Sequence, residues 1–315
     1  MTDVKQERGQ TLVLTVLALV VLLGMAAMVL DVGAWFHQKR HLQATADAAA
    51  LAGAQFLPDY PGTAQSQAVS YGTKNGGGVL AGNVTITSSR HPNDTISVKA
   101  AKTNKGVFSR VLGIMNVNIG ATAKARVDAP KQALHVAPMV VSCAHQLIQN
   151  CNGNRTPQFN VRTTLNFDPM GAPGAFGMLN LDGASGTVGT SKESAWILKG
   201  FDKYLGLGDY KSDPGAKFSS QNIRTALNLR LNTVLLFPVF RVLKGTGQNA
   251  IYQIMGWIGF YLESYTVNGN NAVLRGYFTQ YIAQGIQVSS GGGSGSGGSG
   301  SSPITFGVRT VQLIG

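Results

Sequence analysis

The sequence predicts an α+β fold with a long N-terminal transmembrane helix, a small α+β unit and a larger, mostly antiparallel β domain with two helices. Three observations lead to this prediction. Residues 11–30 form an apolar run without a charge, residues 62–128 mix helical and strand periodicities, and residues 129–315 are dominated by β-prone runs. Only 13% of the 315 residues are charged, about half the share usual in soluble globular proteins. The composition therefore argues against a highly solvated cytosolic enzyme.

Residues 11–30 are expected to cross a membrane once and to remain as an anchor. These 20 residues, at ~1.5 Å each in a helix, match a hydrocarbon core about 30 Å thick. A cleaved signal peptide is the alternative, because Lys5 and Arg8 give the chain a basic start. However, the apolar region of a signal peptide runs for ~7–15 residues and ends at a small-x-small site, whereas the nearest Ala-x-Ala triplet here begins at Ala44. A buried core helix is a third interpretation.

The orientation of the anchor does not follow from the flanking charges. Lys39 and Arg40 after the run match the basic residues before it, and long domains cross membranes largely regardless of charge. The low charge of the body, its Gly and Ser content and its two closely spaced cysteines favour a position outside the cytoplasm. We therefore expect residues 1–10 to form a cytoplasmic tail and the chain beyond the span to be extracytoplasmic.

The helix is expected to continue beyond the membrane, so that residues 11–57 form a transmembrane helix followed by an Ala-rich stalk. No proline interrupts the chain before Pro58, which then ends the helix. Asp31, Trp35 and Phe36 fall where the membrane meets water, and the amphipathic rings of Trp and Phe favour that depth. These three residues are the predicted membrane interface.

Ala44, Ala48 and Ala52 recur at every fourth position of the stalk. Residues four apart lie on one helix face, and small side chains let another helix approach closely. Asp47 accompanies them, and a carboxylate beside an apolar interface requires a cationic or hydrogen-bonding partner. We expect these four residues to pack against a partner helix. The alternative is that the alanines serve helix propensity alone.

Three motifs of the N-terminal region occur in a fixed order: a Gly-Gln pair before the apolar run, an Asp-x-Gly at its end and an Ala-rich motif after it. They are Gly9-Gln10, Asp31-Val32-Gly33 and the segment LQATADAAALAGA at 42–54. The region resembles the N-terminal segment of TadG-like and TadE-like Flp (Tad) pilus-assembly proteins. The resemblance implies a bacterial envelope protein of the type IV pilin-related secretion machinery. Its N-terminal helix would lie in the inner (cytoplasmic) membrane or be bundled with other pilus-assembly or pilin-like membrane subunits.

The resemblance also raises processing after Gly9, as in prepilins. Pilin precursors usually carry Glu five residues after the cleavage glycine, and the residue at that position here is Leu14. Larger members of the family can carry a von Willebrand A-like domain, whose metal site needs Asp-x-Ser-x-Ser. The nearest counterpart, Asp182 with Ala184 and Gly186, lacks both serines. We therefore expect no metal at this position.

Residues 62–128 are expected to form a small α+β domain, and the resemblance implies that this domain is pilin-like. Helices are predicted at 64–74 and 106–112, and strands at 84–87, 95–100 and 117–127. The last strand alternates most clearly between apolar and polar residues, which predicts one buried face and one face exposed to water. The Asn93-Asp94 pair suits a hairpin turn.

Residues 129–315 are expected to form a strand-rich external domain. Strands are predicted at 134–142, 233–243, 250–267, 272–288 and 304–314, with helices at 192–205 and 220–231. The turn residues at 268–271 predict a long hairpin. The Gly/Ser tract at 289–302 has no side chains to bury, so we expect a long surface loop between two strands; a boundary between domains is the alternative.

Cys143 and Cys151 are the two cysteines of the chain and enclose seven residues. In an oxidising envelope we expect them to form a disulfide that pins the loop after a strand ending at Ser142. Such a small ring stabilises the fold by ~2–3 kcal/mol in the loop-entropy model. Two buried thiols are the alternative.

The sequence gives little support for catalysis. It contains no HExxH, GxxxxGK[ST] or GxSxG motif. His37 and His41 would share a helix face, but no third metal ligand is near them in the sequence. Cys143 and the histidines at 135 and 145 have no flanking residues typical of a thiol protease. We therefore expect neither enzyme activity nor a cofactor.

The net charge of +12 lies wholly after residue 60. It favours contact with anionic surface polymers, but the basic residues are scattered and lack the interleaved aromatic residues of specific nucleic-acid binding. We infer a non-catalytic, membrane-anchored component of a Tad/Flp pilus assembly or secretion system. A membrane-tethered cell-surface binding or adhesion protein is the alternative, and an anchored hydrolase is a third interpretation.

Overall fold

A computed structural model describes residues 4–153, 155–168, 174–183, 187–215, 217–283 and 306–314. The chain divides into two compact units: unit 1 comprises residues 1–127 and 311–315, and unit 2 comprises residues 128–310. Unit 1 has its own hydrophobic core, and so has unit 2. The Gly/Ser loop expected at 289–302 lies outside the described residues.

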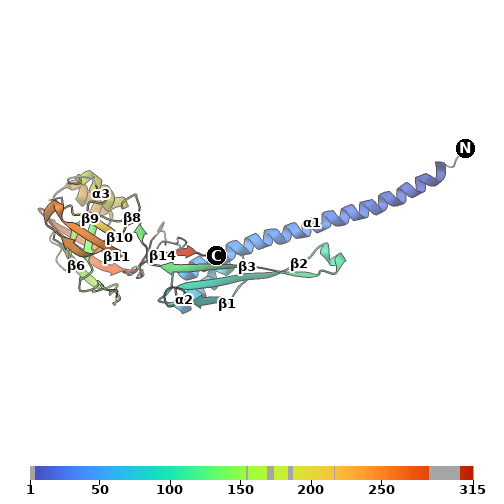
Figure 1. Ribbon diagram of the computed structural model, residues 1–315, viewed down its shortest axis with the longest axis horizontal. Helices are drawn as coiled ribbons and strands as arrows, with labels where there is room; N and C mark the ends of the chain where they lie inside the picture. The colour runs from blue at the N-terminus through green and yellow to red at the C-terminus, as the bar shows by residue number, and fades with distance from the viewer. Residues whose placement is uncertain are drawn as a thin grey trace, which may run out of the picture. The chain divides into compact units, whose positions relative to one another are not determined.

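One helix, α1 (Val4–Ala54), contains both the apolar run and the Ala-rich segment (Figure 1). The Leu and Ala residues favour a helix, and no proline occurs before Pro58. The two halves of α1 differ in burial. The large apolar side chains between Leu12 and Leu30 are 46–69% exposed, whereas beyond this run one face of the helix is buried in unit 1. The predicted long N-terminal helix is confirmed.

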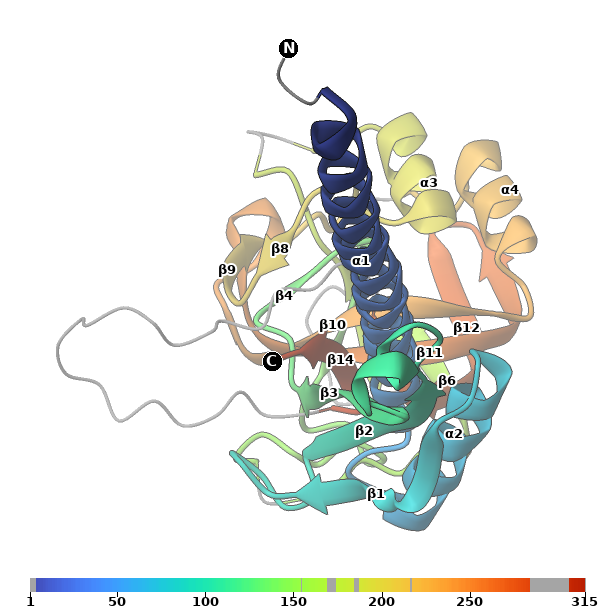
Figure 2. The same ribbon diagram turned by 90° about the vertical axis from the view of Figure 1, so that its right-hand side faces the viewer.

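Unit 1 packs α1 and a second helix, α2 (Pro61–Lys74), against an antiparallel sheet. Its elements are β1 (Val79–Thr87), β2 (Thr95–Lys105), the 3₁₀ turn η1 (Ser109–Leu112) and β3 (Asn116–Asp128). β2 pairs with β1 on one side and with β3 on the other, and α2 lies beside β1 (Figure 2). Buried Ala121, Ala123 and Ala125 alternate with more exposed residues along β3, which confirms the predicted alternation.

Small side chains let α1 lie close to the sheet and to α2. The fully buried apolar residues of this part of the helix are Leu42, Ala46, Ala49, Ala50 and Ala54. A Cβ atom added at Gly53 would lie 2.6 Å from Ile96 Cδ1 and 2.8 Å from the carbonyl oxygen of Ala64, so this site has no room for a side chain. We expected the Ala-rich stalk and residues 62–128 to be separate parts of the chain, whereas both belong to unit 1 and share its core. The sequence did not indicate this, because a face of small residues does not reveal what packs on it.

In its described residues, unit 2 contains two helices, α3 (Thr190–Lys199) and α4 (Gln221–Leu229), which lie beside each other (Figure 2). Its other elements are β4 (Gln132–Ala133), β5 (Met139–Ser142), β6 (Arg162–Phe167), β7 (Ala175–Met178), β8 (Leu205–Gly206), β9 (Gly208–Lys211), β10 (Thr233–Lys244), η2 (Gly247–Asn249), β11 (Ile251–Asn268), β12 (Asn271–Thr279) and β13 (Tyr281–Ile282).

The main sheet of unit 2 closes on itself. Its strand order is β10-β5-β7-β6-β12-β11-β9, and β10 also pairs with β11. The β5–β10 and β6–β7 pairs are parallel, while the other pairs of this sheet are antiparallel. The prediction of a mostly antiparallel domain with two helices is therefore confirmed.

Aromatic side chains fill the core of unit 2. The ring of Phe237 stacks on Phe260 with centroids 5.2 Å apart, and Phe260 meets Phe278 edge-on at 5.5 Å. A second cluster joins Trp257 of β11 to Trp196 of α3. Because β11 contributes to both clusters, many consecutive residues of this strand are buried, which explains its nearly continuous apolar sequence.

The last strand, β14 (Val308–Leu313), begins in unit 2 and ends in unit 1. Its first residues pair in parallel with β13. At its other end, β14 neighbours β3, and the amide of Ile314 donates a hydrogen bond to the carbonyl of Lys124 in β3 at 2.9 Å. We expected residues 129–315 to form one domain, but residues 311–315 belong to unit 1, because a strand's periodicity does not specify its pairing partner.

Candidate functional site

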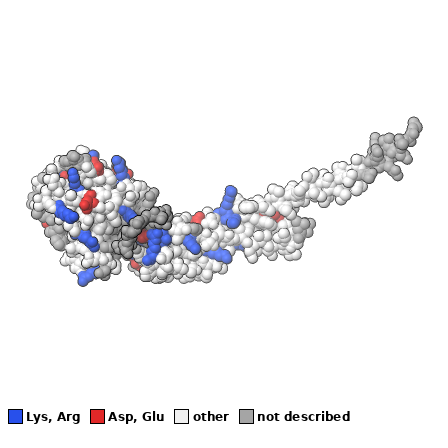
Figure 3. All heavy atoms as spheres, in the orientation of Figure 1, with Lys and Arg blue, Asp and Glu red and all other residues white. Residues whose placement is uncertain are grey.

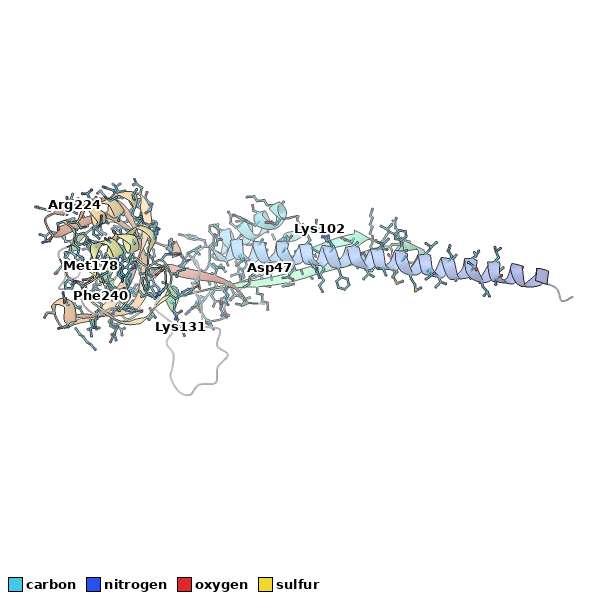
Figure 4. The ribbon with its side chains drawn as sticks, turned by 90° about the horizontal axis from the view of Figure 1, so that it is seen from above. Asp47, Lys102, Lys131, Met178, Arg224 and Phe240 are labelled. Atoms are coloured by element: carbon cyan, nitrogen blue, oxygen red, sulfur yellow. A yellow bond between two sulfur atoms is a disulfide. The ribbon has the colours of Figure 1, made fainter. Side chains whose placement is uncertain are left out.

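The first candidate site is the exposed half of α1, from Thr11 to Leu30. Its side chains are apolar except for two threonines, and Thr15 Oγ1 donates a hydrogen bond to the carbonyl of Thr11 at 2.8 Å. Figure 3 shows this part of the helix without charged side chains, and Figure 4 shows its side chains projecting in several directions. Its length and composition suit a membrane crossing. Gly9, the predicted processing residue, lies in the helical backbone just before this part.

Asp31 ends the apolar run and is nearly buried, at 5% exposure. Its carboxylate accepts backbone N–H bonds from Val107 at 3.3 Å, Phe108 at 2.9 Å and Ser109 at 2.6 Å. These amides lie at the start of η1, where N–H groups have no helical partner. The carboxylate therefore joins the end of the apolar run to the connection between β2 and β3.

Trp35 and Phe36, the other predicted interface residues, differ in exposure. Trp35 is half-buried and packs against the core of unit 1, whereas Phe36 is exposed. Both side chains border a groove whose opposite wall includes Ile119 of β3. Their position at a membrane surface stays a prediction.

The four predicted helix-packing residues do not share one environment. Ala44 is exposed, Ala48 is half-buried, and Ala52 is buried within unit 1. The carboxylate of Asp47, labelled in Figure 4, accepts a hydrogen bond from Gln43 Nε2 at 2.8 Å. Ala44 and Ala48 therefore leave surface for another helix, whereas Ala52 does not, and Asp47 has a hydrogen-bond donor within its own helix.

Cys143 and Cys151 form a disulfide in unit 2, with their Cα atoms 5.0 Å apart. The bridge closes the loop that follows β5. The guanidinium Nε of Arg241 donates to the carbonyl of Cys151 at 3.1 Å, which holds the far end of the loop. Within the loop, the buried ring of His145 meets Phe278 edge-on at 5.0 Å. This histidine is a core residue, and the disulfide leaves no free thiol for it to activate.

The sequence did not predict a buried cluster of charges in unit 2. Lys217 Nζ donates to the carbonyl of Val188 and to Glu193 Oε1, both at 2.8 Å, and also to Asp213 Oδ2. The three ionisable side chains are 6% exposed or less. Burial, reinforced by the neighbouring Asp213, raises the pKa of Glu193 to about 8. The three residues follow no motif, so the sequence offered no signal for this cluster.

The described histidines do not form a metal site. Within the described ranges, no three His, Cys, Asp or Glu side chains are grouped so that they could hold a metal ion. His37 and His41 are exposed. The ring of His41 lies against Gly76, where an added Cβ would be 2.3 Å from His41 Cε1. His41 therefore packs on the surface of unit 1.

Comparisons with known proteins give information on α1. The comparison with curated proteins gives no match, and the comparison with solved structures gives none either. A family model matches residues 9–55, which extend from the predicted processing glycine to the end of the Ala-rich motif. The N-terminal segment of the chain is thus similar to the family described as "Putative Flp pilus-assembly TadE/G-like", the family that its motifs indicated.

Proposed function

We propose that the chain is a non-catalytic, membrane-anchored component of a Tad/Flp pilus assembly or secretion system. One observation carries the proposal: the family match at residues 9–55 contains the whole exposed apolar run at 11–30. Exposed apolar surface is unfavourable in water by roughly 25 cal/mol per Å², and a lipid bilayer removes that cost. The helix that carries the pilus-assembly motifs is therefore also the anchor.

The anchor is proposed to lie in the bacterial inner membrane, with the N-terminus in the cytoplasm and both units outside. The Cys143–Cys151 disulfide supports this orientation, since disulfides persist in oxidising compartments. The low charge of the chain also suits an envelope protein. The excess of Lys and Arg beyond residue 60 favours non-specific contact with anionic surface polymers.

The proposed partners are other pilus-assembly or pilin-like membrane subunits, which contact α1. Exposed Ala44 and half-buried Ala48 present a small-residue surface that starts about 21 Å beyond the end of the apolar run at Leu30. Small side chains allow helix backbones to approach closely. The buried face of the same segment is occupied by the sheet and by α2 of unit 1, so a partner helix must use the Ala44 side.

Complementation in the native bacterium tests the function. Removing the chain is expected to abolish Flp pili, and the wild-type chain is expected to restore them. The double variant Leu17→Arg with Val20→Arg should not restore them, because two arginines raise the free energy of insertion by about 5–7 kcal/mol and release the chain from the membrane fraction. Leu17→Ile with Val20→Ile is the matched control and should behave as wild type. Normal pili without the chain would contradict the proposal and favour a cell-surface binding or adhesion protein.

A further inference from the structure

A second apolar surface lies beside the exposed half of α1, at the connection between β2 and β3. We refer to residues 106–115 as the hairpin tip. Val107, Phe108, Ile114 and Met115 of the tip are 69, 44, 45 and 63% exposed. Large apolar side chains gathered on one exposed loop mark a contact with an apolar partner.

Internal hydrogen bonds hold the hairpin tip in one conformation. The amide of Gly106 donates to the carbonyl of Met115 at 3.1 Å, and the amide of Ile114 donates to the carbonyl of Ser109 at 3.0 Å. Gly113 turns the chain at φ 83°, a conformation open to glycine without strain. The exposed apolar side chains are therefore presented by a folded loop.

The hairpin tip lies alongside the apolar run of α1. Phe108 borders an apolar pocket with Val21 and Met25, both of which belong to the run at 11–30. At ~1.5 Å per residue, these two residues lie roughly 8–14 Å inside the end of the run at Leu30. A membrane that covers the whole run therefore reaches the hairpin tip.

Asp31, the residue after the apolar run, holds the backbone of the hairpin tip at the end of that run. Its carboxylate is held by the three successive amides of residues 107–109. A carboxylate close to lipid is costly unless hydrogen bonds satisfy it. The loop that supplies these donors also exposes Val107 and Phe108, so one loop satisfies the charge and presents an apolar surface.

Basic residues accompany the hairpin tip. Lys102 and Lys105 near the end of β2 and Arg110 in η1 are exposed, and residues 95–127 contain neither Asp nor Glu. Figure 4 shows Lys102 on β2, nearer to the apolar run of α1 than Asp47 is. Basic side chains next to an apolar loop match the anionic head groups that lie above the acyl chains.

We propose that the hairpin tip inserts into the lipid interface beside α1 and forms a second membrane contact of unit 1, with Lys105 and Arg110 at anionic head groups. This inference rests on the proposed anchoring of α1. Lipid is favoured as the partner of the tip because Phe108 lies against Val21 and Met25, so the apolar surface of the tip continues that of the membrane-spanning run. A second contact restricts the rotation of unit 1 about the axis of its anchor.

Depth-dependent fluorescence quenching tests the insertion in the full-length protein. Both native cysteines are in the disulfide, so a single introduced cysteine can carry an environment-sensitive NBD label. Val107→Cys and Met115→Cys report on the hairpin tip, and Leu19→Cys reports on the anchor. Exposed Thr87→Cys is the matched control. Thr87 pairs with Thr95 at the start of β2, so it lies at the end of the sheet that is far from the tip. The vesicles contain phosphatidylcholine and phosphatidylglycerol with nitroxide lipids at shallow or deep acyl positions.

The expected result is strong quenching of the labels at 107 and 115 by shallow nitroxides, quenching at 19 by deep nitroxides, and none at 87. Quenching at 19 without quenching at 107 and 115 would overturn the inference and leave the anchor standing. No quenching at 19 would overturn the anchoring itself. Labels at 107 and 115 that become shielded only after another pilus-assembly subunit is added would also overturn the inference, in favour of a protein partner.

The head-group contact has its own measurement. The double variant Lys105→Gln with Arg110→Gln is expected to lower quenching at 107 in vesicles with phosphatidylglycerol and to leave it unchanged in pure phosphatidylcholine. Lys124→Gln with Arg126→Gln, from the other end of β3, is the matched control and should have no effect. Quenching equal to wild type in the anionic vesicles would overturn the assignment of these two residues to head groups.

Discussion

Among single residues, Gly53 and Gly33 of α1 form a natural pair for comparison. Nothing lies within 4 Å of a Cβ added at Gly33, whereas at Gly53 it would lie 2.6 Å from a side-chain atom and 2.8 Å from a backbone oxygen. Gly53→Ala is expected to destabilise unit 1 by about 1–3 kcal/mol through overpacking. Gly33→Ala should stabilise the helix by about 0.5–1 kcal/mol. Urea unfolding in detergent, followed by circular dichroism, measures both changes, and equal effects would contradict the close approach of α1 to α2.

Glu193 makes the stability of unit 2 depend on pH. Its pKa is raised from 4.5 to about 8, so the folded chain keeps a proton that the unfolded chain releases between these values. The contribution of this group is therefore fully present below about pH 4.5 and is lost as the pH rises through about 8. Glu193→Gln should remove this loss. Glu263→Gln, whose carboxylate pairs with Arg162 at the surface, should retain it. Unfolding midpoints near pH 5 and pH 8 provide the measurement, and an unaltered pH dependence in Glu193→Gln would contradict the assignment.

At the scale of elements, α1 contains two kinds of alanine. Ala44 and Ala48 have surface available to a partner, whereas Ala49 is fully buried in the core of unit 1. Ala44→Leu with Ala48→Leu is expected to leave folding and insertion intact, since Leu is also a strong helix former, but to impair pilus assembly. Ala49→Leu is the matched variant and should destabilise unit 1 by about 1–3 kcal/mol. Normal assembly with the double variant at wild-type abundance would show that this surface is not a docking site.

The success of sequence-based prediction also differed between elements. β3 was predicted because one face alternates with the other over its whole length. β7 was missed because its four residues are all buried, so no alternation exists to detect. Asp31 was singled out as the end of the apolar run, but its partners are backbone amides 76–78 residues away. Backbone amides have no sequence signature, so this contact could not be predicted.

At the scale of the whole molecule, contacts between distant segments also could not be predicted from the sequence. The cluster around Lys217 joins side chains from α3 and from the loop before α4, and β14 joins the sheet that starts with β1. Both depend on which elements meet, and periodicity reports only the exposure of each element separately. The fold class could therefore be predicted, whereas the membership of residues 311–315 in unit 1 could not.

Unit 1 is formed by two separate stretches of the sequence, so unit 2 is a domain inserted into unit 1. We call unit 2 the guest and unit 1 the host. The two ends of the guest meet: Thr310 Oγ1 donates to the carbonyl of Asp128 at 3.4 Å. Adjacent ends are what domain insertion requires. A chain in which a short Gly/Ser turn replaces residues 129–309 is therefore expected to retain a protease-resistant unit 1 in the membrane. A chain that stops at residue 283 lacks β14, and its unit 1 should be digested faster.

Equal digestion of the two shortened chains in limited proteolysis would contradict the contribution of β14. If the host folds without its guest, recombination at the two ends of unit 2 can exchange unit 2 for another domain. Such an exchange leaves α1 unchanged. Proteins that exchange the guest in this way would resemble one another over the host, residues 1–127 and 311–315, and would differ in unit 2. Residues 9–55 are the part of this chain in which a family match is found.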